Sequence, residues 1–266
     1  MKAIGTGRQA DVYEKDGQAF KVYKEWVSIE EIQYEADISQ KVAEVCSIAP
    51  KFFGLVEQDG KQVLKLEYIQ GGLLSSVMSK NIFRLKKNVQ QMGRLHRKIH
   101  ENTITGLKTV TEKFEERLLQ FKDIDPDSLN KLMAFLNNSD KKALCHGDLH
   151  PENIIVDDTN KMRVIDWVDA YCGDPLSDVA RTYYLLKHGT PPGERSNFEQ
   201  LAQKQAGEFI GRVYLKSYFD GKPIPVRELN MWGLIIRICR SFDGIKEEQE
   251  PLKQSIDMGI QKLLRE

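Results

Sequence analysis

The stretch CHGDLHPENIIVD, residues 145–157, and the Ile165-Asp166-Trp167 that follows it decide how this chain is interpreted. Three of their oxygen-bearing side chains stand out: Asn153 lies five residues after Asp148, and Asp166 lies thirteen residues after Asn153. Apolar runs on either side of a polar tip predict a short hairpin between Asn153 and Asp166, which brings the three side chains to one end of a small sheet. Hard cations such as Mg²⁺ prefer oxygen ligands. Phosphoryl transfer needs such a metal site and a carboxylate for the attacking hydroxyl, with little covalent chemistry from the protein.

The chain around this segment has a helical pattern. From Gly71-Gly72 onward apolar residues recur at spacings of three and four, which places them on one face of a helix. One such face consists of Leu85, Val89, Met92, Leu95 and Ile99. The hairpin, expected within residues 143–169, interrupts this pattern. We therefore predict a mainly helical lobe over residues 71–266.

The first seventy residues differ from the rest, because short runs of alternating apolar and polar residues predict strands. Asp16-Gly17 and Asp59-Gly60 are typical of two-residue hairpin turns. Ser28 and Glu31 form a capping-box signature, which predicts the start of one helix. The strands are expected at 2–6, 10–15, 18–24, 52–58 and 62–69. Residues 1–70 should thus form a small antiparallel sheet with one helix, and the whole chain a two-lobed α+β protein.

Composition limits the partners. The 266 residues hold 39 Lys and Arg against 39 Asp and Glu, so no global charge draws the chain to nucleic acid or to an anionic membrane. No apolar stretch approaches the roughly 18 residues that a membrane span needs. Four scattered cysteines favour neither a zinc site nor a disulfide framework, and the first residues lack a secretory signal. We expect a cytoplasmic protein with no nucleic-acid or membrane partner, whose ligands are chosen by a local site.

His146-Gly147-Asp148, with Asn153 and Asp166, resembles the catalytic and metal-binding motifs of the aminoglycoside phosphotransferase and choline kinase family, which has a two-lobed protein-kinase-like fold. The likeness continues through VIDWVDAYCGDPLSDVA, residues 164–180. It implies that Asp148 is the catalytic residue, which accepts or orients the hydroxyl proton. It also implies that Asn153 and Asp166 hold Mg²⁺.

Two departures separate these motifs from those of protein kinases, H-R-D-L-x-x-x-N and D-F-G. Gly147 stands in place of the arginine, and Trp167-Val168 stands in place of Phe-Gly. Both favour the small-molecule kinases of this fold.

The resemblance extends to a nucleotide site in the first lobe. Residues 4–12, IGTGRQADV, are similar to the kinase glycine-rich loop, with Ala10 in place of its third glycine. Gly5 and Gly7 would let backbone N–H groups approach the phosphates. By the same resemblance, LEYIQGG at residues 66–72 is the hinge, where the carbonyl of Glu67 and the N–H of Ile69 receive the base. The choice between ATP and GTP stays open, because backbone groups read the base.

A lysine and a glutamate complete the implied nucleotide site. Lys21 resembles the lysine of the kinase strand motif, and Lys24 is its rival. Glu35 is the expected partner of Lys21 because it lies in the middle of the predicted helix. Its rivals Glu30 and Glu31 lie in the first turn, where acidic residues favour the helix dipole.

Other polar residues are assigned to support by the resemblance. His146 should brace the catalytic loop, and Asp178 should hold that loop from the following helix. His150 either orients the loop or touches the substrate. His96 and His100 have zinc-like spacing, but the sequence offers no third ligand beside them. The acidic stretch from Asp243 to Glu250 is either a solvated helix face or a site for a cationic substrate.

The sequence therefore predicts a Mg²⁺-dependent kinase that transfers the γ-phosphoryl group of ATP or GTP to a hydroxyl of a small molecule. The alternatives are a choline-, ethanolamine-, sugar- or homoserine-type metabolite kinase, a protein kinase, and a nucleotide-binding pseudokinase scaffold. A metal hydrolase built on His146, Asp148 and His150 would leave Lys21 and Glu35 without a purpose. The sequence does not identify the acceptor or the oligomeric state.

Overall fold

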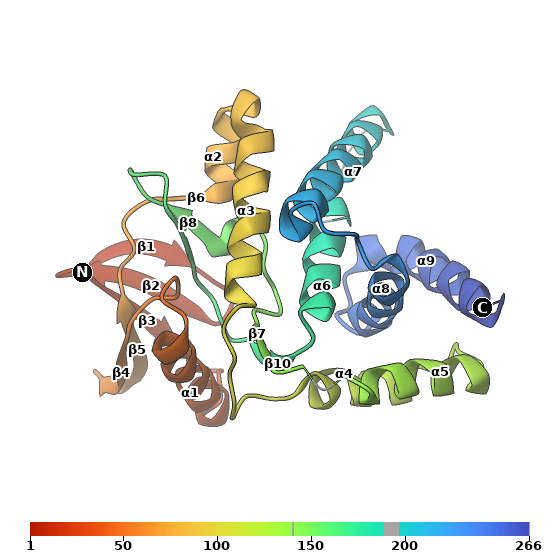
Figure 1. Ribbon diagram of the computed structural model, residues 1–266. Coiled ribbons are helices and arrows are strands. Elements are labelled where there is room, and N and C mark those ends of the chain that lie inside the picture. The colour runs from red at the N-terminus through yellow and green to blue at the C-terminus, as the bar shows by residue number, and fades with distance from the viewer. Residues whose placement is uncertain (140, 189–196, 266) are drawn as a thin grey trace. The chain divides into compact units, whose positions relative to one another are not determined.

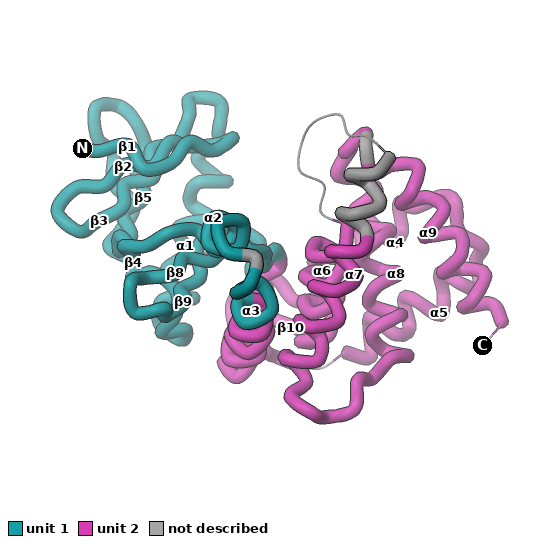
Figure 2. Tube along the Cα trace, turned by 90° about the horizontal axis from the view of Figure 1, so that it is seen from above, with its two compact units in different colours: residues 1–88, 148–170 teal, residues 89–147, 171–266 magenta. Residues whose placement is uncertain are grey.

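The computed structural model describes residues 1–139, 141–188 and 197–265. Their contacts divide the chain into two compact units, which Figure 2 shows in different colours. Unit 1 consists of Met1–Asn88 and Asp148–Ala170, and unit 2 of Val89–Gly147 and Tyr171–Glu266. The segment from Asp148 to Asp166 thus groups with the N-terminal residues. The division into lobes 1–70 and 71–266 stays a prediction.

Unit 1 is built on a five-stranded antiparallel sheet in the order β1-β2-β3-β5-β4. Its strands are β1 (Lys2–Thr6), β2 (Ala10–Lys15), β3 (Gln18–Tyr23), β4 (Phe52–Gln58) and β5 (Lys61–Glu67). All five predicted strands are found, although β5 was expected to continue to residue 69. The strand ends at Glu67 because its partner in the ladder is Gln18, the first residue of β3.

The two Asp-Gly pairs form the predicted turns. Asp16 and Gly17 have φ values of 52° and 74°, and Asp59 and Gly60 have 53° and 72°. Two successive residues in the left-handed region are the signature of the hairpin turn whose twist matches that of the strands. The turns therefore fix the registers of β2 against β3 and of β4 against β5.

Helix α1 (Ile29–Val45) lies against the sheet beside β4 (Figure 1). Its capping box is formed as predicted, because the Ser28 hydroxyl accepts from the N–H of Glu31 at 3.2 Å and the Glu31 carboxylate accepts from the N–H of Ser28 at 3.1 Å. The helix buries Ile32, Glu35, Ala36, Ile38 and Val42. Glu35 is the charged member of this buried face.

Replacing Ser28 by Ala should lower the free energy of unfolding by about 1 kcal/mol, because the N–H of Glu31 loses its acceptor. Chemical denaturation would measure the change. Ser28→Asp keeps an acceptor at the cap and should stay close to the wild type. Equal destabilisation by both substitutions would contradict the capping role.

The rest of unit 1 contains the predicted hairpin. Strands β8 (Ile154–Val156) and β9 (Met162–Val164) pair antiparallel, and β6 (Gly72–Leu73) adds a third strand on β8. The short helices are α2 (Leu74–Lys80), η1 (Ile82–Arg84) and η2 (Pro151–Asn153). The hairpin expected within residues 143–169 is confirmed.

Helix α3 (Leu85–Ile99) begins in unit 1 and continues into unit 2. The remainder of unit 2 is mainly helical, with α4 (Val110–Gln120), α5 (Pro126–Asn137), α6 (Pro175–His188), α7 (Asn197–Phe219), α8 (Val226–Ser241) and α9 (Lys246–Arg265). Two short strands, β7 (Ala143–Cys145) and β10 (Tyr171–Gly173), pair antiparallel.

The core of unit 2 centres on α8, which packs against α4, α6 and α9. Trp232 on α8 is fully buried, and its ring contacts Phe135 with centroids 5.0 Å apart. Among the described residues, no helix combines the length and apolar character that crossing a bilayer requires.

Candidate functional site

A cavity of about 460 Å³ lies within unit 1. That volume is within the range of small-molecule sites. Its lining includes six of the nine residues assigned from the sequence to catalysis, nucleotide binding or metal binding: Gly7, Lys21, Glu35, Glu67, Ile69 and Asp166. Three others, Gly5, Asp148 and Asn153, are not among the lining residues.

The glycine-rich loop joins β1 to β2 at the cavity. The N–H of Gly7 donates to the carbonyl of Ala10 at 2.8 Å, and a Cβ added at Gly7 would lie 3.2 Å from that oxygen. Gly5 lies on β1 opposite Val12, next to an irregularity in the register. Lys24, the rival of Lys21, donates to the carbonyl of Gly7 at 2.7 Å and so braces the loop.

Lys21 and Glu35 form an ion pair, with Lys21 Nζ 2.5 Å from Glu35 Oε1. Glu35 is only 5% exposed, so its carboxylate is shielded from water, while the side chain of Lys21 is 20% exposed. Lys21 Nζ also lies 3.9 Å from Asp166 Oδ1. Glu31 is occupied by the helix cap, which leaves Glu35 as the glutamate that reaches Lys21.

The loop that carries Asp148 is tied to the hairpin by Asn153. The Asn153 side-chain NH₂ donates to the carbonyl of Asp148 at 2.9 Å, and the N–H of Ile165 donates to the carbonyl of Asn153 at 2.9 Å. His150 Nε2 lies 3.4 Å from Asp148 Oδ2 and 3.2 Å from the Asn153 amide nitrogen. Since the NH₂ group of Asn153 braces the loop, its Oδ1 remains the atom suited to a metal.

Asp166 has φ of 61°, in the left-handed region. Residues other than glycine rarely adopt it, and such strained positions cluster at functional sites. The Asp166 side chain is 48% exposed, so its carboxylate can accept an external ligand. An amide oxygen and a carboxylate are hard donors, so the side chains of Asn153 and Asp166 fit Mg²⁺ chemically.

The predicted hinge is contacted by a residue that sequence analysis missed. Arg163 on β9 contacts Glu67 Oε2 at 2.8 Å and also donates to the carbonyls of Ile48 and Ala49. Burial raises the pKa of Glu67, but hydrogen bonds from Arg163 and from the N–H of Lys51 outweigh it and leave the pKa below its usual value. Arg163 therefore joins the strand before Asp166 to the predicted base-binding hinge. No local pattern around Arg163 could have signalled this contact.

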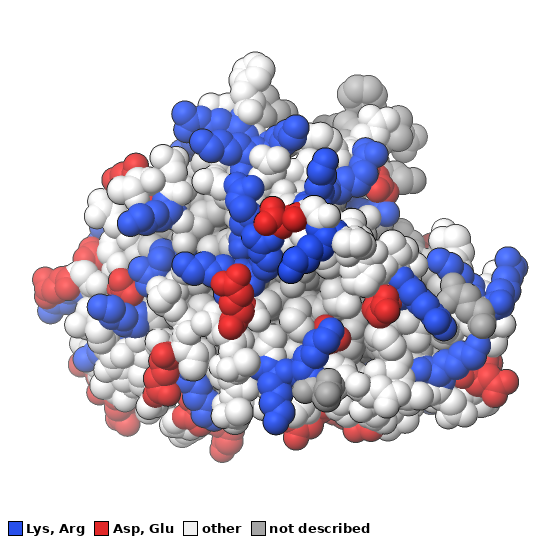
Figure 3. All heavy atoms as spheres, in the orientation of Figure 1, with Lys and Arg blue, Asp and Glu red and all other residues white. Residues whose placement is uncertain are grey.

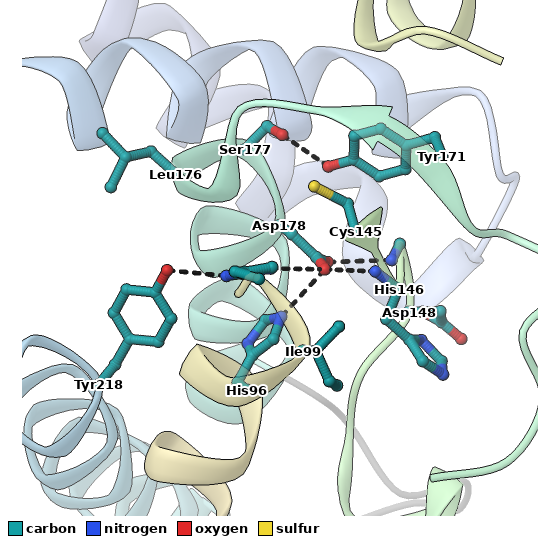
Figure 4. A network of polar contacts seen from close by, with 12 residues as sticks. His96, Ile99, Cys145, His146, Asp148, Tyr171, Leu176, Ser177, Asp178 and Tyr218 are labelled. Carbon is teal, nitrogen blue, oxygen red and sulfur yellow. Dashed lines mark hydrogen bonds and ion pairs between the residues drawn. The ribbon is translucent and has the colours of Figure 1, made fainter. Parts of the chain in front are cut away.

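In unit 2, Asp178 on α6 organises a buried network (Figure 4). Its Oδ1 accepts from the N–H of Gly147 at 3.0 Å, and its Oδ2 accepts from the N–H of His146 at 2.5 Å. Gly147 has φ of 83°, a conformation that favours glycine over the arginine of protein kinases. Asp178 thus holds the backbone directly before Asp148, and its assignment to loop support stays a prediction.

Two histidines complete the network. His96 Nε2 and His100 Nε2 lie 2.9 and 3.2 Å from Asp178 Oδ2, and their Nδ1 atoms contact Tyr214 and Tyr218. Burial raises the pKa of Asp178, but the two histidines and their hydrogen bonds hold it well below its usual value.

Asp178 supplies the third potential ligand that the sequence had not offered for His96 and His100. Nevertheless, neutral imidazoles satisfy every one of these contacts. Each Nε2–H donates to the carboxylate, and each Nδ1 accepts from a tyrosine hydroxyl. The network is complete without a cation.

Acid should destabilise the protein through His96. Burial, with a smaller effect of His100, lowers the pKa of His96 to about 4 from 6.5. Below pH 6.5 the unfolded chain therefore binds a proton that the folded chain does not, so stability present above that pH is lost as the pH falls to about 4. The full loss would be about 3 kcal/mol.

Urea denaturation at a series of pH values would measure how steeply the free energy of unfolding falls with acid. His96→Gln keeps a donor toward Asp178 but does not titrate, so its stability should fall less steeply with acid. An unchanged slope in that variant would show that another group sets it.

The acidic stretch from Asp243 to Glu250 is largely used within unit 2. Glu248 accepts from Arg240 at 2.9 and 3.0 Å, and Asp243 contacts Arg117 and Arg240. Burial raises the pKa of Tyr184 to about 12, and the nearby Glu248 adds to that rise. The side chain of Glu247 lies outside the described residues. Structural ion pairs thus account for Asp243 and Glu248.

A family model described as the phosphotransferase enzyme family matches residues 20–212. None of the curated proteins compared matches the chain in sequence. Among solved structures, the choline kinase LicA from Streptococcus pneumoniae matches with a TM-score of 0.57 and 15% identity, over 100% of this chain and 93% of that one.

Two aminoglycoside phosphotransferases are also similar. A thermostable mutant of APH(4)-Ia, in a ternary complex with AMP-PNP and hygromycin B, has a TM-score of 0.64 and 14% identity over 97% of this chain and 92% of its own. APH(3'')-Id from Streptomyces rimosus, in complex with ADP and streptomycin, has a TM-score of 0.53 and 15% identity over 86% of this chain and 90% of its own. At such identities the likeness shows the fold, and it confirms the predicted α+β kinase-like fold.

Proposed function

The chain belongs to the phosphotransferase enzyme family, as its motifs predicted, and on this basis we propose that it transfers the γ-phosphoryl group of ATP or GTP to a hydroxyl of a small molecule. In this proposal residues 1–70 form the nucleotide-binding lobe, and residues 71–266 supply the catalytic groups and the acceptor site.

The observation that carries the proposal is the cavity of unit 1 with its charged groups. Lys21, fixed by Glu35, lies beside Asp166 on a wall that also contains Gly7. A fixed cation beside a glycine-rich loop suits the phosphates of a nucleotide. The backbone of Glu67 and Ile69, which also line the cavity, would receive the base, with Arg163 holding the hinge.

We assign the metal to Asn153 and Asp166, whose oxygens are hard donors. When bound there, Mg²⁺ would offset the negative charge on the phosphate oxygens during transfer. The proposed role fits the side chain of Asn153, since its NH₂ group holds the Asp148 loop while its oxygen stays available.

Asp148 would accept the proton of the acceptor hydroxyl as that oxygen bonds to phosphorus. Its position is set from both sides along the chain. Asp178 holds the N–H groups of His146 and Gly147 before it, and Asn153 holds the carbonyl of Asp148 itself. Most of the acceleration would then come from alignment and electrostatic stabilisation.

We place the reaction in the cytoplasm. The four cysteines are buried and form no disulfide, which suits a reducing compartment. The acceptor classes to compare are aminoglycosides, choline and ethanolamine, sugars and homoserine-type alcohols. Because Asp243 and Glu248 are paired with arginines, the acidic stretch gives no preference for a cationic acceptor.

A coupled nucleotide-turnover assay would test the proposal, with ATP and GTP in Mg²⁺ against this panel of acceptors and Asp148→Asn as the blank. Turnover that depends on one acceptor and is lost in the variant would support the kinase and identify its substrate. Nucleotide binding without turnover on any acceptor would favour the scaffold alternative. Failure to bind Mg²⁺-nucleotide would overturn the proposal.

A further inference from the structure

The chain has no net charge, but one segment of it is strongly cationic. Residues 68–100 contain seven Lys and Arg and no Asp or Glu, in a chain whose total charges balance at 39 against 39. All seven lie between residues 80 and 98, which we call the cationic segment. It runs from the end of α2 through η1 and along α3.

Most of these charges are exposed and unneutralised. Arg97 contacts Asp220 at 2.9 Å. The other six are exposed, and within the described part of the chain no carboxylate forms an ion pair with them: Lys80, Arg84, Lys86, Lys87, Arg94 and Lys98. Figure 3 shows Lys and Arg gathered over α2 and the N-terminal end of α3.

The helix arranges part of this charge in a line. α3 is one uninterrupted helix, and Lys87, Arg94 and Lys98 follow one another at spacings of seven and four residues. At 3.6 residues per turn these three lie on one face. We call them the cationic stripe.

An apolar group projects beside the cations. Phe83 is 96% exposed, the most exposed of the large hydrophobic side chains that the structure describes. It lies in η1 between Lys80 and Arg84. An exposed aromatic ring flanked by cations suits a partner that offers negative charge and an apolar layer together.

We propose that the cationic segment binds the surface of an anionic phospholipid bilayer, with Phe83 inserted at the headgroup boundary. Peripheral anchoring needs two signals, and a basic patch beside an apolar group supplies both. A bilayer offers lipid phosphates and an apolar layer together. Nucleic acid offers phosphates, but single-strand binders stack successive bases on several aromatic rings, and Phe83 is the one Phe, Tyr or Trp between residues 80 and 98.

This proposal revises the expectation, based on total charge, that the protein has no membrane partner. It involves none of the residues assigned to phosphoryl transfer. Membrane binding can therefore be tested independently of the proposed reaction. It also requires no membrane-spanning helix.

The test is sedimentation of the full-length protein with vesicles of phosphatidylcholine alone, or with about a third of phosphatidylserine. We expect binding to the anionic vesicles only, weakened by salt. Each cation near the surface strengthens binding about fivefold, so Lys87→Gln, Arg94→Gln and Lys98→Gln together should weaken it about a hundredfold. The matched control changes the exposed Lys15, Lys61 and Lys253 to Gln, which alters net charge equally and should have little effect.

Variants at Phe83 distinguish binding to a bilayer from binding to other polyanions. Phe83→Ala should weaken vesicle binding about tenfold without changing its salt dependence, because the lost contribution is apolar. Phe83→Trp should show a blue shift of fluorescence with anionic vesicles. Melting temperatures near that of the wild type would show that the variants fold.

Three outcomes would overturn the proposal. The first is no binding to anionic vesicles, and the second is equal loss in the stripe and control variants. The third is that single-stranded RNA competes with the vesicles for the protein while Phe83→Ala leaves vesicle binding unchanged. That result would assign the segment to nucleic acid.

Discussion

Replacing Asp148 by Asn should lower kcat by about a thousandfold while nucleotide affinity stays near that of the wild type. Asn keeps the shape of the side chain but cannot take up the hydroxyl proton, and a general base contributes about 10²–10⁴ in rate. Nucleotide affinity should persist because Asp148 does not line the cavity. Turnover with the best acceptor, and titration of Mg²⁺-nucleotide, would measure the two quantities.

A matched control lies in the same hairpin. The Asp157 carboxylate accepts from the N–H groups of Thr159 and Lys161 in the turn, so Asp157→Asn makes the same chemical change away from the cavity. Its kcat should stay close to the wild type. Full turnover in Asp148→Asn, or equal losses in both variants, would remove Asp148 from the proposed chemistry.

Replacing Asp166 by Ala should abolish Mg²⁺-dependent nucleotide binding. The substitution removes the anionic metal ligand and the carboxylate 3.9 Å from Lys21. Calorimetric titration of nucleotide with Mg²⁺ and with a chelator would measure the effect. In the variant, the two titrations should give the same weak affinity.

The backbone at this position requires a second variant. Because Asp166 has φ of 61°, alanine there introduces strain as well as removing charge. Asn tolerates that conformation, so Asp166→Asn separates the two effects. Affinity restored by Asn would point to strain as the cause, and wild-type Mg²⁺-nucleotide affinity in both variants would exclude Asp166 from the metal site.

The parts of the fold that sequence predicted are those controlled by neighbouring residues. The Asp-Gly turns fixed the first hairpins, and Ser28 with Glu31 fixed the start of α1, because the groups involved are three residues apart or fewer. The end of β5 was predicted two residues too late, since it depends on where its partner β3 begins. The helices of unit 2 were predicted only as a group and without individual bounds, even though neighbouring residues cap α4 at Thr109 and α5 at Asp125.

The same distinction between local and long-range contacts applies to the residues of the candidate site. The resemblance to kinase motifs and the place of Glu35 in the middle of its helix predicted the Lys21–Glu35 contact, which the structure contains. The Arg163–Glu67 contact joins residues 96 positions apart, and the His100–Asp178 contact joins residues 78 positions apart, with no periodic pattern to reveal either. Long-range contacts between single side chains become visible only when the strands and helices are placed.

The buried cysteines have a practical consequence. Burial raises the pKa of Cys239 to about 12 and the pKa of Cys145 well above its usual value, and Cys46 is only 2% exposed. Thiol reagents attack the thiolate, so the natural cysteines should react slowly with maleimides while the protein is folded. A cysteine introduced at exposed Phe83 would then be the preferred target, and a fluorophore or spin label could be attached there without first removing any natural thiol.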